Sequence, residues 1–68
     1  MLDDKSQVVL EYIKKHFSKT DKHITTVDIH IDGLDINDIN KCVDALYLNG
    51  YINLNDRYIH KIVEGIND

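Results

Sequence analysis

Two segments of the chain place apolar residues at the three- and four-residue spacing of an amphipathic helix. In the first, from about residue 4 to 18, the apolar stripe consists of Val9, Leu10, Ile13 and Phe17. In the second, from about residue 35 to 49, it consists of Ile39, Val43 and Leu46. Asp4 and Asp35 stand where an N-cap is expected, and Gly50 stands where the second helix should end. The pattern therefore predicts two helices with defined ends.

The segment from residue 24 to 32 fits two patterns. Its β-branched residues alternate with polar ones, as in a strand, yet every third or fourth position is also apolar, as in a helix. Thr25 is followed three residues later by Asp28, which has the form of a capping box and favours a short helix over about residues 25–31. Gly33 then permits a tight turn into the next helix, and this turn implies that the two helices cross.

After Gly50 the pattern changes to a period of two. Ile52 and Leu54 alternate with polar residues, and Asn55 with Asp56 makes a favourable turn, so we predict a β-hairpin over about residues 51–62. A hairpin alone is marginal in water and needs the helices to pack on. The predicted fold class is α+β, with a three-helix core and a C-terminal hairpin in a single domain of residues 1–68.

Size and composition set limits on this picture. A chain of 68 residues buries only about 60% of its unfolded surface, so the core is small. The chain has neither an apolar run long enough for a membrane span nor the layout of a signal peptide at its start, which predicts a cytoplasmic protein. One cysteine, Cys42, cannot form an internal disulfide, and its place beside the apolar stripe predicts a packed thiol.

Charge is segregated along the chain, whose net charge is −4. A basic group, Lys14, Lys15 and Lys19, falls near the end of the first helix, where it either stabilises the helix dipole or contacts phosphate. An acidic group recurs at helical spacing in the middle of the chain: Asp35, Asp38 and Asp44. These aspartates either form a negative strip or only cap and solvate the helix.

Several packing and turn positions resemble those of small winged helix-turn-helix regulators from bacteria, archaea and phages. The resemblance rests on the turn Gly33-Leu34, on the apolar positions of the helix that follows, and on Gly50, Tyr51 and Ile52 at the opening of the hairpin. It covers roughly residues 4 to 65, including a last strand and exit at 58–65. One departure is the predicted second helix, which is one residue shorter before Gly33 than is usual in that family. The resemblance implies a DNA-binding transcriptional regulator with the hairpin as its wing.

By position, the resemblance implies that the third helix enters the major groove and that the tip of the wing contacts the DNA backbone or the minor groove. The candidate DNA-contacting residues are Asn37, Asn40, Lys41, Arg57, His60 and Lys61. Asn can pair with adenine in two ways, and Lys can bind guanine or phosphate. Asp38 and Asp44 lie on the same face and oppose this. Either could accept a hydrogen bond from a cytosine amino group, but both would meet a dense row of phosphates.

Two other functions follow from other residues. The acidic helix, through Asp35, Asp38 and Asp44, predicts a protein-interaction module with a basic partner protein and no DNA binding. Alternatively, the chain completes a larger assembly through apolar anchors, namely Tyr47, Leu48, Tyr51 and Tyr58. For the DNA-binding regulator we expect a homodimer, with Tyr12 and Leu10 of the first helix at the contact.

Other chemistry has little support in the sequence. The four histidines, His16, His23, His30 and His60, form no close pair on one helix face, so we expect no metal site. No carboxylate pair, nucleophile or phosphate-binding loop is evident. The sequence therefore predicts a protein that is not an enzyme and holds no cofactor.

Overall fold

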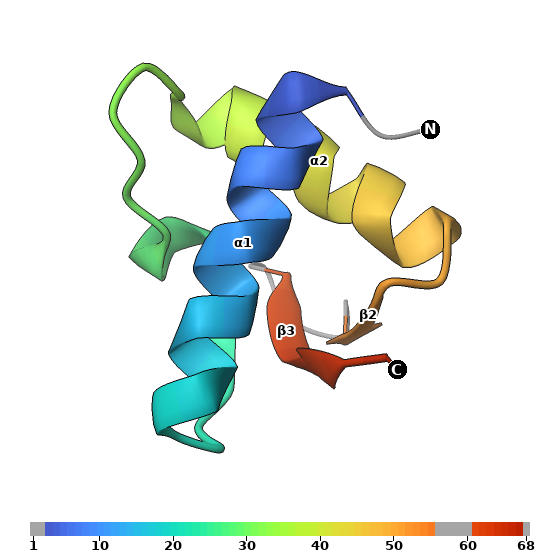
Figure 1. The fold of residues 1–68 in the computed structure, drawn as a ribbon. Helices are drawn as coiled ribbons and strands as arrows, with labels where there is room; N and C mark the ends of the chain where they lie inside the picture. The colour runs from blue at the N-terminus through green and yellow to red at the C-terminus, as the bar shows by residue number, and fades with distance from the viewer. Residues whose placement is uncertain (1–2, 56–60, 68) are drawn as a thin grey trace.

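The computed structural model describes residues 3–55 and 61–67 of the chain. Within these ranges, two α-helices, α1 (Asp4–Lys19) and α2 (Ile36–Leu48), pack against each other and against a three-stranded antiparallel sheet. The strands are β1 (Ile24–Thr25), β2 (Ile52–Asn55) and β3 (Ile62–Ile66), and a 3-10 turn, η1 (Thr26–Asp28), follows β1. Figure 1 shows α1 crossing α2, with β2 and β3 beside the C-terminal halves of the helices.

The predicted short helix over residues 25–31 is wrong. Residues 24 and 25 form a strand, η1 is a single turn, and Ile29 is already extended, with φ −88° and ψ 117°. The Thr25 hydroxyl donates to the Asp28 carboxylate at 2.8 Å and makes no cap to the backbone, so the expected capping box does not form. The many β-branched side chains in this segment favour the extended backbone. Over residues 3–55 and 61–67 the fold is therefore α+β with two helices, and these residues do not form the predicted three-helix core.

The predicted two-stranded hairpin is also wrong, because β2 and β3 belong to a three-stranded sheet. The strand order is β1-β3-β2, so β3 lies in the centre and pairs antiparallel with both neighbours. Ile24 faces Val63 on one side of β3, and Leu54 faces Val63 on the other. The register with β2 shifts between Asn53 and Leu54, which marks a bulge. β3, which corresponds to the second strand of the predicted hairpin, ends at residue 66, whereas the predicted hairpin ends at about residue 62.

The core lies between the two helices and the inner face of the sheet. Its buried apolar residues are Val9, Leu10, Ile13, Ile24, Ile29, Ile39, Cys42, Val43, Leu46, Ile52 and Val63. The thiol of Cys42 is buried and free, as its place beside the apolar stripe predicts. Leu10 is only 6% exposed, so it belongs to this core and cannot supply the dimer contact expected of it. Both helices and all three strands of the described part of the chain contribute to this one small cluster.

Both helices begin at an aspartate cap. For α1 the cap is Asp3, one residue before the predicted Asp4, and its carboxylate accepts a hydrogen bond from the Ser6 N–H at 2.7 Å. This bond to the backbone holds the pKa of the exposed Asp3 carboxyl below its ordinary value. For α2 the cap is Asp35, as the sequence predicts, and it accepts from the Asp38 N–H at 2.9 Å. Each carboxylate satisfies a donor that the helix itself leaves unpaired.

The cap at Asp35 predicts different effects for two substitutions. Asp35→Ala removes the acceptor and should lower the free energy of unfolding by about 1 kcal/mol. Asp35→Asn keeps a side-chain oxygen for the Asp38 N–H, so it should cost only a few tenths of a kcal/mol. Urea unfolding followed by circular dichroism measures both. Equal losses for the two variants would mean that the charge of Asp35 matters and the cap does not.

Among the described residues, no helix has the length and apolar character needed to cross a bilayer.

Candidate nucleic-acid interface

The outward face of α2 carries a group of polar side chains without partners in the described part of the chain. These are Asn37, Asn40 and Lys41, of which the first and last are exposed and Asn40 is half-buried. Together with Asp44 they span about 100° of the helix circumference, at 100° per residue. The buried side chains of α2 occupy the opposite arc. This face is where the sequence places its helical DNA contacts, so three of the six candidates lie together.

The two aspartates that oppose DNA binding on α2 both lie beside lysines. Asp38 lies 3.6 Å from the Lys5 ammonium on the first turn of α1. Asp44 accepts a hydrogen bond from Lys61, which directly precedes β3. Lys5 is brought to Asp38 by the packing of α1 on α2, and Lys61 reaches Asp44 from the residue that precedes β3. Asp44 and Lys61 are 17 positions apart in the chain, so the sequence does not show that they are close. The aspartates therefore add less negative charge to this face than the sequence suggests.

The candidate contacts on the hairpin are only partly described. Lys61 is half-buried, and its ammonium binds Asp44, so its charge is already engaged within the fold. Arg57 and His60 lie outside the described residues. The structure thus brings one hairpin candidate, Lys61, close to α2 and gives it an ion-pairing role that its position in the sequence does not indicate.

The three carboxylates of the predicted acidic strip all have partners within the chain. Asp35 caps α2, while Asp38 and Asp44 have the lysine partners described above. Exposed ion pairs of this kind stabilise a fold by only about 0–1 kcal/mol, but each places a cation next to the carboxylate. A basic partner protein would therefore compete with Lys5, Lys61 and the Asp38 N–H for these carboxylates.

The expected apolar anchors form a separate surface at the C-terminal end of α2. Leu48 is 81% exposed, and Tyr47 and Tyr51 are exposed beside it in sequence. The chain turns there because the Tyr51 N–H donates to the Leu46 carbonyl and the Gly50 N–H to the Tyr47 carbonyl. Tyr58, the fourth expected anchor, lies outside the described residues.

The histidines in the described part of the chain do not gather. His16 makes a 2.7 Å hydrogen bond through Nε2 to the Lys22 carbonyl, and its ring stacks edge-on against Phe17. No group of three or more His, Cys, Asp or Glu side chains in the described ranges is arranged to hold a metal ion.

Comparison with known proteins adds no identification. The chain matches no protein-family model, no curated protein and no solved structure. The resemblance to winged helix regulators thus has no support from these comparisons, and its three-helix fold is not the one observed.

Proposed function

We propose that this protein is a small DNA-binding protein, and that α2 contacts duplex DNA through Asn37, Asn40 and Lys41. The observation that carries the proposal is the polar face of α2, where two amides and an ammonium group lack side-chain partners within the described residues. A helix of 13 residues is about 20 Å long and fits the major groove, which is about 12 Å wide. Asn and Lys at its N-terminal half have the donor and acceptor groups needed for base edges.

The ion pairs at Asp38 and Asp44 support the same function. A free carboxylate near phosphate repels it, whereas a carboxylate beside a lysine presents a nearly neutral pair. With Lys5 and Lys61 engaged in these pairs, Lys41 is the described cation on this face that is left to bind DNA. Because the chain as a whole carries a net charge of −4, we expect weak binding to random DNA and a larger contribution from base contacts.

The proposal includes a cytoplasmic location, a role in regulating transcription and no catalytic activity. A protein-interaction function through Asp35, Asp38 and Asp44 is less well supported, since each of these carboxylates already has a partner within the chain.

The first experiment is a selection from a pool of randomised duplexes at low salt, followed by amide chemical-shift mapping with an enriched duplex. We expect enrichment of a defined sequence and shifts centred on residues 36–44. A pool that shows no enrichment, with a spectrum that does not change at low salt, would overturn DNA binding.

Two lysine variants then test the surface. Lys41→Ala should weaken binding to the enriched duplex about tenfold, which corresponds to about 1.4 kcal/mol for one base contact. Lys22→Ala removes the same charge from the connection after α1 and serves as the matched control, with an expected change below about twofold. Equal losses for both variants would show that only the net charge matters and would contradict the role given to α2.

A further inference from the structure

An exposed apolar patch surrounds the connection between η1 and α2. We call it the connection patch and define it by the exposed side chains Val8, Val27 and Ile36, with Tyr12 and Ile31 between them. Val8 is 47% exposed, Val27 42% and Ile36 43%. These residues come from three different elements, so the patch is a property of the fold and has no counterpart in a single run of sequence. Clustered exposed apolar residues mark an interaction site more often than scattered ones do.

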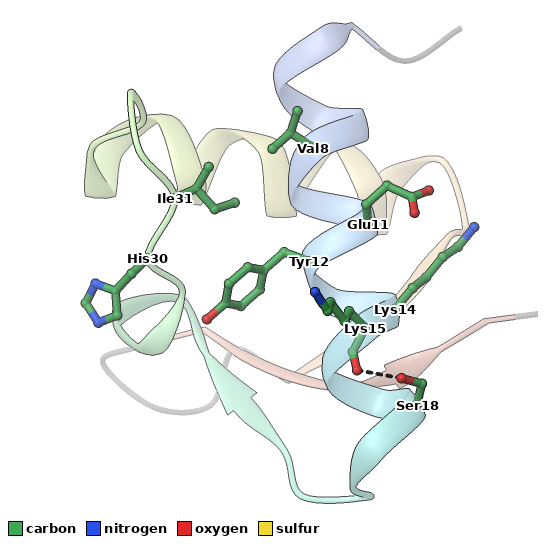
Figure 2. Close-up of a pocket in the computed structure, with 8 residues that line it drawn as sticks. All are labelled: Val8, Glu11, Tyr12, Lys14, Lys15, Ser18, His30 and Ile31. Atoms are coloured by element: carbon green, nitrogen blue, oxygen red, sulfur yellow. Dashed lines mark hydrogen bonds between the residues drawn. The ribbon is translucent and has the colours of Figure 1, made fainter.

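The patch is hollowed on both sides of the connection. On one side a groove runs between α1 and the connection, and Figure 2 shows Tyr12 projecting from α1 toward His30 with Val8 above it. On the other side a second hollow lies between the connection and α2, and its apolar lining includes Val27, Leu34, Ile36 and Ile39. His30 and Ile31 line both hollows and join them into one surface.

The charges at the two ends of the patch have opposite sign. Lys14 and Lys15 lie at the α1 end, together with Glu11, and neither lysine has an ion-pair partner among the described residues. Asp32 lies at the α2 end, where it lines the second hollow and has no side-chain partner within the described ranges, and the exposed Asp35 follows it. The patch is thus apolar in the middle, positive at one end and negative at the other.

A surface of this kind is complementary to itself when a two-fold axis passes through its middle. The two-fold places the positive end of each copy against the negative end of the other, while the apolar centres cover each other. We propose that the connection patch is the contact surface of a symmetric homodimer, with Lys15 of each copy facing Asp32 of the other. Of the two residues that the sequence places at a dimer contact, Tyr12 belongs to this patch, whereas Leu10 is buried in the core.

The dimer should be weak and sensitive to salt. Only three exposed apolar side chains form the centre of the patch, so we expect a small interface, of the class that buries less than about 1,200 Å² in total. Charges at the rim of such an interface are screened by added salt. The patch contains none of Asn37, Asn40 and Lys41, so a failure of the dimer and a failure of DNA binding are separate results.

Charge reversal gives a sharp test by sedimentation velocity on the whole chain at rising concentration. The wild-type chain should dimerise, and Lys15→Glu and Asp32→Lys should each weaken the dimer about tenfold or more, since each variant alone faces like charges twice. An equimolar mixture of the two variants should dimerise again. In the mixed dimer, the carboxylate introduced at position 15 of one copy meets the ammonium introduced at position 32 of the other, and the remaining pair of Asp32 with Lys15 is unchanged.

Two controls and a check of folding complete the design. Lys22→Glu reverses a charge away from the patch, and Leu48→Ala removes the most exposed side chain of the surface at the end of α2; both should dimerise like the wild type. Circular dichroism should show that all variants fold. A wild-type chain that stays monomeric at millimolar concentration would overturn the proposal, as would dimerisation lost in Leu48→Ala or not restored in the mixture.

Discussion

Leu46→Ala should lower the free energy of unfolding by about 3 kcal/mol, because it leaves a cavity in the core. The Leu46 side chain is fully buried on the inner face of α2. A chain of this length has a total stability of about 5 kcal/mol, so this one change removes more than half of it. With a urea dependence of about 1 kcal/mol/M, the unfolding midpoint should fall by about 3 M.

Leu48→Ala is the matched control for this prediction. It deletes the same atoms from the same helix two positions later, but the Leu48 side chain is 81% exposed. Its effect should stay within about 0.5 kcal/mol, since little apolar surface is lost and Ala is a good helix former. Similar losses for the two variants would contradict the placement of the core on the side of α2 that carries Leu46.

The sequence predicts the two long helices because their signals are local. Apolar spacing of three and four residues, an aspartate before the first turn of α2 and a glycine after its last turn all act within one element. The error at residues 25–31 arises because the same residues satisfy two periods. The choice between them is made by the pairing of Ile24 with Val63, which lie 39 positions apart in sequence and meet only in the folded sheet.

The sequence predicts less of the candidate site than of the two helices. Helical spacing alone puts Asn37, Asn40 and Lys41 on one face, and the structure has them on the outward side of α2. What spacing cannot show is that Lys5 and Lys61 come from other elements to stand beside Asp38 and Asp44. Net charge counts these residues without regard to their positions, so it overstates how strongly the helix repels DNA.

Gly50→Ala should lower the free energy of unfolding by at least about 1 kcal/mol through backbone strain alone. Gly50 has φ +81°, a conformation that residues with a Cβ resist, although apart from the adjoining residues no described heavy atom lies within 4 Å of an added Cβ. The conformation is required because α2 ends there: the Gly50 N–H donates to the Tyr47 carbonyl, and the Tyr51 N–H to the Leu46 carbonyl. This pair of bonds is a Schellman motif and turns the chain into β2.

Gly65 provides the control that separates strain from crowding. It also has open space around an added Cβ, but it lies in β3 and its φ is not positive. Gly65→Ala should therefore be neutral or stabilise the fold by a few tenths of a kcal/mol, because Ala restricts the unfolded chain. Gly50→Asn should fall between the two alanine variants, since Asn tolerates the left-handed region better than Ala does. Urea unfolding of the three variants measures this order, and a loss at Gly65 equal to that at Gly50 would show that the positive φ of Gly50 is not the cause.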